Sequence, residues 1–205
     1  MQEAGITVTC FVSEPTGRLV DPATHAEFLD GVKRSVQMAA RLNAQSLIVV
    51  SGDSRPGVDR RRQLDALVDA LGHAAPIAAT AGVRLLLEPL NTRVDHPGYL
   101  LDATSDALRV IRNVDHPAVR LLYDLYHSIV MGEDPEQVLA GSGDLIGHVH
   151  VADVPGRHEP GSGQVDWRRQ MAALRTSGYS GPVGLEYTPT RDTKSSLELI
   201  RRLLQ

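Results

Sequence analysis

Short apolar runs alternate along the chain with longer stretches in which apolar residues recur every three or four positions. The short runs are rich in valine, isoleucine and leucine and predict strands over residues 6–12, 46–50, 83–90, 119–126, 146–152 and 183–187. The longer stretches predict amphipathic helices over residues 25–42, 61–81, 105–113, 135–140, 167–177 and 193–204. Strands that alternate with helices in this way are typical of an α/β fold with a parallel sheet.

Two parallel architectures fit this alternation. An open doubly wound sheet usually carries a glycine-rich phosphate loop after an early strand. The loop SGDSRPG at residues 51–57 contains glycines but matches neither G-x-G-x-x-G nor the P-loop. The other architecture is a TIM-type (β/α) barrel, in which the active site lies at the C-terminal ends of the strands. Charged residues gather at those ends here, which favours the barrel.

Ionisable side chains lie near the C-terminal ends of four predicted strands. Because successive strand residues point to opposite faces, one residue of each strand can point into the barrel while its apolar neighbours pack beneath the helices. The residues on the inward face are Glu88, Asp124, His150 and Glu186. We therefore expect three carboxylates and one imidazole to converge at one point.

A divalent cation would satisfy such a cluster, because buried carboxylates are normally paired or bound to metal. Oxygen ligands with one nitrogen suit Mg²⁺ or Mn²⁺, with Zn²⁺, Co²⁺ or Fe²⁺ as alternatives. Each residue also has a structural interpretation. Asp124 can cap the segment that follows it, and Glu88 and Glu186 can pair with arginines. His148 lies one step deeper than His150 and is more typical of a hydrogen-bonded core histidine.

Four motifs in order resemble the hydroxypyruvate isomerases, a branch of the xylose isomerase-like (β/α)₈ barrels. They are EPLN at 88–91, DLYH at 124–127, GHVHVAD at 147–153 and GLEY at 184–187, and the segments DHPGY at 95–99 and PGRHEPGSG at 155–163 add to them. The resemblance implies a metal site of Glu88, Asp124, His150 and Glu186, with Glu88 and Glu186 as the proton-transfer pair. It also implies that His127 and Arg157 hold substrate oxygens. Asn91 and His96, which lie in two of these segments, are further candidates for substrate contact.

The activity implied by the resemblance is isomerisation of hydroxypyruvate to tartronate semialdehyde, or of a related 2-oxo-tetronate, through an enediolate. A sugar epimerase of the same superfamily is an alternative, although Val94 stands where related ketose epimerases place a further glutamate. An abasic-site endonuclease of the same barrel class would need more histidine ligands and a basic groove. A non-catalytic relative is the last alternative.

The number of predicted strands departs from this resemblance. Barrels of the family have eight strands, whereas six are predicted here within a single domain over residues 1–205. The strand at 6–12 resembles the family's third, so the first two β/α units are expected to be absent from the N-terminus. An opened barrel exposes strand edges and invites pairing with another chain, which predicts a homo-oligomer.

Composition limits the other partners. Apolar residues make up 42% of the chain, charged residues make up 22%, and the formal net charge is −4. This balance predicts a small-molecule substrate and neither nucleic-acid nor membrane binding. No apolar run is long enough for a membrane helix, and we expect no signal peptide. Cys10 is the only cysteine, which excludes an internal disulfide and favours a cytoplasmic protein.

Overall fold

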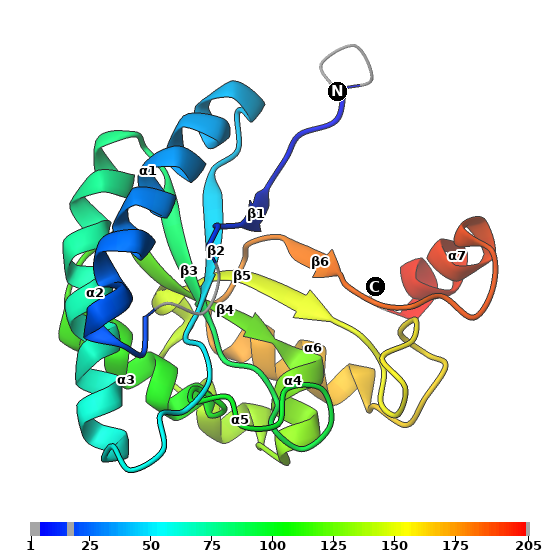
Figure 1. The fold of residues 1–205 in the computed structure, drawn as a ribbon. Coiled ribbons are helices and arrows are strands. Elements are labelled where there is room, and N and C mark those ends of the chain that lie inside the picture. The colour runs from blue at the N-terminus through cyan, green and yellow to red at the C-terminus, as the bar shows by residue number, and fades with distance from the viewer. Residues whose placement is uncertain (1–4, 16–18, 204–205) are drawn as a thin grey trace.

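Six strands form one parallel sheet in a computed structural model that describes residues 5–15 and 19–203 (Figure 1). They are β1 (Cys10–Val12), β2 (Ser46–Val50), β3 (Arg84–Glu88), β4 (Val119–Asp124), β5 (Ile146–Val151) and β6 (Val183–Leu185). Each strand pairs in parallel with the next one along the chain, so β1 and β6 form the two edges. The predicted architecture, an incomplete TIM-type barrel of six β/α units, is confirmed.

Helices follow the strands, and the larger ones early in the chain cover the outer side of the sheet. They are α1 (His25–Leu42), α2 (Arg60–Thr80), α3 (Thr104–Val114), α4 (Leu125–Met131), α5 (Pro135–Val138), α6 (Trp167–Thr176) and α7 (Thr193–Leu203). Two single 3₁₀ turns, η2 (Pro22–Thr24) and η3 (Gly143–Leu145), were not expected from the sequence. Figure 1 shows α1, α2 and α3 side by side against the sheet, whereas α7 lies on the opposite side of the molecule. No helix among the described residues is long and apolar enough to cross a bilayer.

The strands have two different faces, as their alternation predicts. Leu85, Leu87 and Val149 belong to the large core between sheet and helices. Leu86 and Leu122 belong to a small second cluster that contains no helical residue and lines the inside of the barrel. The residues that follow on this inner face, toward the strand ends, are the ionisable ones. The pleat therefore directs the ionisable side chains inward and the bulk of the apolar ones outward.

Side-chain caps set the boundaries of several helices. The carboxylate of Asp59 accepts hydrogen bonds from the amides of Arg61 and Arg62 at 2.9 and 3.3 Å, so α2 begins directly after it. Asn43 ends α1 in the left-handed conformation with φ 52°, a position that asparagine tolerates better than most residues. Such local signals explain why the predicted helix boundaries agree with the structure to within one or two residues.

The predicted strands differ from the observed ones at the edges of the sheet, at β4 and at β3, where the predicted strand 83–90 ends already at Glu88. The predicted strand 6–12 is reduced to β1, which has a pairing partner on one side only. The predicted strand 119–126 ends at Asp124, because the next two residues already belong to α4. We expected Val183 and Leu185 to pack beneath helices, but they are 38% and 39% exposed because β6 is the last strand of the sheet.

Candidate active site

The structure brings together the four residues that the sequence assigned to a metal site. Glu88 ends β3, Asp124 ends β4, His150 lies near the end of β5, and Glu186 follows β6 directly. One ligand atom from each side chain lies within 4.8 Å of the ligand atoms of the other three. Convergence of this kind follows from the parallel sheet, since all of its strands end at the same rim.

His150 lies between the two glutamates. Its Nδ1 atom is 3.1 Å from Oε2 of Glu186 and 3.9 Å from Oε1 of Glu88. Nδ1 is buried and makes no hydrogen bond of regular geometry among the described residues. Burial alone would lower the pKa of His150, but Cys10, Glu186 and Glu88 outweigh it and raise the pKa to about 10. The imidazole is therefore protonated when no cation is present, and a cation that binds Nδ1 displaces its proton.

The two carboxylate oxygens of Asp124 have different roles. Oδ1 accepts hydrogen bonds from the amides of Tyr126 at 2.8 Å and His127 at 3.4 Å and so caps α4. Oδ2 is buried and unpartnered, with Nε2 of His127 and Nη2 of Arg157 each 3.6 Å away. Helix capping and ligand binding, which are alternatives when only the sequence is considered, are therefore compatible in one side chain.

The environment separates the pKa values of the three carboxyl groups. Burial, followed by the charges of Asp124 and Glu186, raises the pKa of Glu88 well above its ordinary value. Burial and the charge of Glu186 raise the pKa of Asp124 to about 6. For Glu186 burial acts in the same direction, but His150 and Arg157 outweigh it and lower the pKa to about 2. Glu186 is therefore ionised at neutral pH, whereas the two buried carboxyls resist ionisation when no cation is present.

These residues fit a divalent cation. Two of the four side chains offer buried atoms without a hydrogen-bond partner, Oδ2 of Asp124 and Nδ1 of His150. The repulsion that raises the pKa of Glu88 and Asp124 is the repulsion that a positive ion would relieve. Carboxylate oxygens with one imidazole nitrogen suit hard and borderline cations, so Glu88, Asp124, His150 and Glu186 would hold the ion.

Asn91 fixes the tautomer of His127. The backbone amide of Asn91 donates to Nδ1 of His127 at 3.1 Å, and its side-chain nitrogen is 2.6 Å from the same atom. Because a backbone amide can only donate, Nδ1 carries no proton and Nε2 is the protonated nitrogen. Burial, followed by the charge of Arg157, lowers the pKa of His127 to about 3, so the ring is neutral. Its buried Nε2–H has no hydrogen-bond partner and lies next to Asp124.

The amide of Asn91 is engaged within the protein. Its Oδ1 accepts from the amides of Val94 at 3.0 Å and Asp95 at 2.9 Å, and its Nδ2 donates to Asp95 at 2.6 Å. The substrate contact expected for Asn91 stays a prediction. Its side-chain amide contacts Nδ1 of His127. The ring of His96 lies next to the ring of His127, with the two centroids 5.5 Å apart.

Tyr126 and Asp95 belong to the site although the sequence did not single them out. The hydroxyl of Tyr126 donates to Asp95 at 2.8 Å, and the guanidinium of Arg157 lies over the Tyr126 ring, 5.0 Å from its centroid. Arg157 itself adopts φ 55°, an uncommon conformation for a residue other than glycine. Nη2 of Arg157 donates to Glu186 at 2.9 Å. Tyr126 lies in the motif DLYH, but only the tertiary structure shows that its ring packs against the guanidinium of Arg157.

Asp153 organises the loop that carries Arg157, and the sequence did not reveal this role. Asp153 is fully buried, and Oδ2 accepts from the Gly161 amide at 2.7 Å and from the indole of Trp167 at 3.0 Å. Oδ1 accepts from the amides of Val154 at 2.9 Å and Val165 at 3.1 Å. Four donors from both ends of the loop therefore meet on one carboxylate. Trp167, the first residue of α6, anchors that helix, as its position in the sequence suggested.

The sequence is similar to those of known proteins. The sequence matches the family described as xylose isomerase-like TIM barrel over residues 1–203. A putative hydroxypyruvate isomerase of Homo sapiens is 33% identical over 185 residues, which cover 88% of this chain and 67% of that protein. A 2-oxo-tetronate isomerase of Cupriavidus necator is 31% identical over 183 residues, which cover 89% and 70%.

The fold is also found in solved structures. A crystal structure of an AP endonuclease, family 2, from Brucella melitensis superposes with a TM-score of 0.90 and 30% sequence identity, covering 98% of this chain and 80% of that one. The family match, the sequence relatives and the superposition of the fold agree with one another. The chain belongs to the xylose isomerase-like TIM barrel family and, within it, to the hydroxypyruvate isomerase-like enzymes.

Proposed function

We propose that the chain is a metal-assisted isomerase of a small hydroxy-keto acid, with hydroxypyruvate or a 2-oxo-tetronate as substrate. The observation that carries the proposal is the cluster of Glu88, Asp124, His150 and Glu186, whose ligand atoms lie within 4.8 Å of one another. Relatives named for these two activities are similar over most of the chain. A divalent cation held by the four residues would polarise the carbonyl of the substrate and stabilise the negative charge of an enediolate.

The two glutamates divide the proton transfer. Glu186 is the base in this proposal, because its low pKa keeps it ionised and its side chain is 49% exposed. It removes a proton from the hydroxymethyl carbon, and the electrons of that C–H bond form the double bond of the enediolate. Glu88 returns a proton to the neighbouring carbon. The hydroxyl proton of the former hydroxymethyl group passes to the former ketone oxygen, so that an aldehyde and a secondary alcohol result. Two carboxylates held on either side of the substrate suit the transfer of a proton between neighbouring carbons.

Arg157 and His127 orient the substrate in this proposal. The guanidinium of Arg157 can fork onto the carboxylate of a keto acid, and it lies over the Tyr126 ring with Nη2 bonded to Glu186. Nε2–H of His127 is an unused donor beside Asp124 and suits a hydroxyl or carbonyl oxygen. Together they would select small substrates that carry a carboxylate next to the reacting carbons.

The related activity of a sugar epimerase remains the second candidate. Val94 is 63% exposed at the position where related ketose epimerases are expected to carry a glutamate, so this chain lacks that carboxylate. The exposed valine favours isomerisation over epimerisation.

Proton exchange in deuterated water tests the proposal. Purified protein is stripped of metal with a chelator, reloaded with Mg²⁺ or Mn²⁺, and incubated with hydroxypyruvate while ¹H NMR follows the hydroxymethyl signal. We expect metal-dependent exchange and formation of tartronate semialdehyde, both lost in Glu186→Gln. If neither hydroxypyruvate nor a 2-oxo-tetronate exchanges any carbon-bound proton in the loaded protein, the proposal is wrong. Epimerisation of a ketose under the same conditions would instead support the second candidate.

A further inference from the structure

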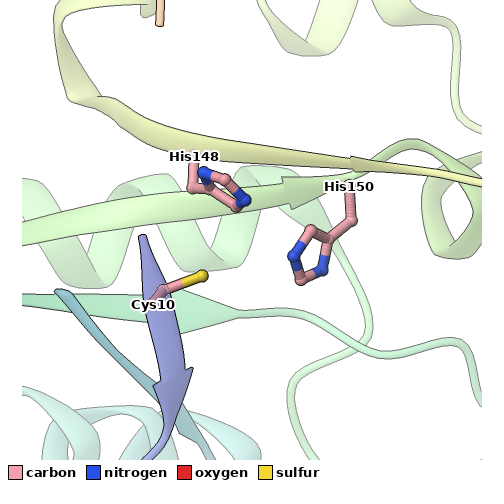
Figure 2. A group of neighbouring side chains, drawn as sticks. All are labelled: Cys10, His148 and His150. Carbon is pink, nitrogen blue, oxygen red and sulfur yellow. The ribbon is translucent and has the colours of Figure 1, made fainter. Parts of the chain in front are cut away.

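A second group of metal-ligating side chains lies inside the barrel next to the carboxylate site (Figure 2). Cys10 on β1 and His148 and His150 on β5 offer one ligand atom each, and these atoms lie within 4.8 Å of one another. Three strands separate β1 from β5 in the sheet, so it is the curvature of the barrel that brings them together. Figure 2 shows the thiol of Cys10 directed toward the two imidazoles. The proposed isomerase mechanism uses neither Cys10 nor His148.

We propose that Cys10, His148 and His150 form a second cation site, selective for a borderline-soft divalent ion of the Zn²⁺ class. The donor set of one thiolate and two imidazoles differs from the carboxylate set beside it. Thiolate and imidazole ligands favour Zn²⁺ and Co²⁺, whereas carboxylates favour Mg²⁺ and Mn²⁺. The same barrel interior would then hold two sites with opposite preferences.

The geometry suits a tetrahedral ion after a small adjustment. Ligand atoms around tetrahedral Zn²⁺ lie roughly 3.5 Å apart, so the present spacing of up to 4.8 Å has to contract by about 1 Å. His148 is only 4% exposed and His150 has an 11% exposed side chain, which keeps both imidazoles ordered by packing. The Cys10 thiol, which is partly buried, interacts with both imidazoles and accepts a contact of 3.8 Å from the Thr9 hydroxyl. Three protein ligands leave the fourth position to water or substrate.

Gly184 makes room for the two imidazoles. A Cβ atom at Gly184 would lie 2.9 Å from Nε2 of His148 and 3.3 Å from Nε2 of His150. Both Nε2 atoms therefore converge on the space above this glycine. A side chain there would displace the rings from each other.

His150 connects the two sites through its two nitrogens. Nδ1 faces Glu88 and Glu186, whereas Nε2 lies on the side of His148. A neutral imidazole has one lone pair and one N–H, so it ligates one ion at a time. When Nε2 binds the soft cation, Nδ1 carries the proton and donates to Glu186, an arrangement common in zinc proteins. When Nδ1 binds a cation in the carboxylate site, Nε2 is lost as a ligand. The two sites therefore compete for His150.

Cobalt absorption tests the second site without any activity assay. Co²⁺ bound to a thiolate shows an intense near-ultraviolet charge-transfer band, and Cys10 is the only thiol in the chain. We titrate metal-free protein with Co²⁺ and expect the band to grow to one cobalt ion per chain and to be bleached by Zn²⁺. Cys10→Ser and His148→Gln should each lose the band. His73→Gln, which removes an exposed imidazole on α2, is the matched control and should keep it.

Two results would show that the proposed second cation site is wrong. One is the absence of a thiolate band at saturating Co²⁺, and the other is a band that His148→Gln leaves intact, because that band would come from a thiol acting without the imidazoles. If His148→Gln does not fold, X-ray absorption of wild-type protein with one Zn²⁺ decides the question. We expect a sulfur scatterer at about 2.3 Å together with imidazole nitrogens, and a shell of nitrogen and oxygen alone excludes the site.

The competition for His150 rests on the proposed function and has a separate test. Zn²⁺ added to Mg²⁺-loaded enzyme should inhibit turnover in the wild type and inhibit Cys10→Ser at least tenfold less potently, with each protein compared with its own zinc-free rate. Equal inhibition of both proteins contradicts the competition. Absence of any turnover contradicts the proposed function and leaves the cobalt result unaffected.

Discussion

Nη2 of Arg157 lies 2.9 Å from Oε2 of Glu186, and the same carboxylate oxygen is 3.1 Å from Nδ1 of His150. Glu186 is half exposed and follows an edge strand, so its position depends on these two partners. The ion pair also makes Glu186 a weak base, because Arg157 and His150 lower its pKa to about 2 against the effect of burial. A substrate carboxylate that draws Arg157 away would raise the basicity of Glu186 when the substrate is in place.

Replacing Glu186 with glutamine should abolish proton transfer while preserving the fold. Glutamine keeps the shape of the side chain but cannot accept the proton, and a positioned acid or base contributes about 10²–10⁴-fold to the rate. We expect kcat to fall by at least that factor, with an unchanged circular dichroism spectrum. Glu198→Gln on the exposed face of α7 is the control. Turnover of Glu186→Gln equal to the control would remove Glu186 from the mechanism.

Replacing Arg157 with glutamine should shift the pH dependence of catalysis. Arg157 helps to lower the pKa of Glu186, so its loss raises that pKa and moves the acidic limb of the kcat/KM profile to higher pH. KM for a keto acid should also rise, because the guanidinium no longer binds the carboxylate. Because the wild-type limb that belongs to Glu186 lies near pH 2, steady-state rates between pH 4 and pH 9 should be level on the acidic side for the wild type and fall toward pH 4 in the variant. A variant profile as level as that of the wild type would show that Arg157 does not set the basicity of Glu186.

The metal-free protein should lose stability as the pH rises. Burial raises the pKa of Asp124 from 3.8 to about 6, so its contribution to stability is fully present below 3.8 and disappears as the pH passes through about 6. A shift of this size corresponds to about 3 kcal/mol of unfolding free energy. The raised pKa of Glu88 acts in the same direction, whereas the lowered pKa of Glu186 acts in the opposite direction and between about pH 2 and pH 4.5.

Urea unfolding in the presence of a chelator measures this effect. Asp124→Asn retains an oxygen that can cap α4 but removes the charge. The difference in unfolding free energy between wild type and Asp124→Asn should therefore change by about 3 kcal/mol between pH 3.5 and pH 7. A difference that is independent of pH would show that Asp124 does not titrate with a raised pKa. Addition of Mn²⁺ at pH 7 should restore the unfolding free energy of the wild type and leave that of the variant unchanged.

Replacing Gly184 with alanine should weaken metal binding. The new Cβ would lie 2.8 Å from Cδ2 of His150 and 2.9 Å from Nε2 of His148, so both rings must move. We expect at least a tenfold loss of Mn²⁺ affinity by isothermal titration calorimetry. Gly72→Ala in α2 is the matched control, since nothing lies within 4 Å of its added Cβ and alanine should stabilise the helix by about 0.5–1 kcal/mol. Unchanged affinity in Gly184→Ala would mean that the rings adapt freely.

Much of the fold was predictable because its signals are local. The amphipathic period of α1 and α2, the caps at Asp59 and Asn43, and the apolar runs of β2 and β3 each act over a few residues. The strand ends were harder to predict, since the start of α4 depends on a hydrogen bond from the amide of Tyr126 to the carboxylate of Asp124.

The sequence by itself determined which residues point inward. The alternation of side chains along each strand places Glu88, Asp124 and His150 on the inner face whatever the rest of the chain does. The order of the motifs then determined the family, and the parallel strands determined that these residues share one rim.

Only the tertiary structure decided the contacts between distant segments. The approach of Cys10 to His148, the tautomer of His127 set by Asn91, and the place of Arg157 over Tyr126 all join residues from different β/α units. Such contacts depend on the curvature of the sheet and on loop conformations held by groups such as Asp153. Periodicity describes which way a side chain points from its own backbone. It does not indicate which residues from other segments contact that side chain.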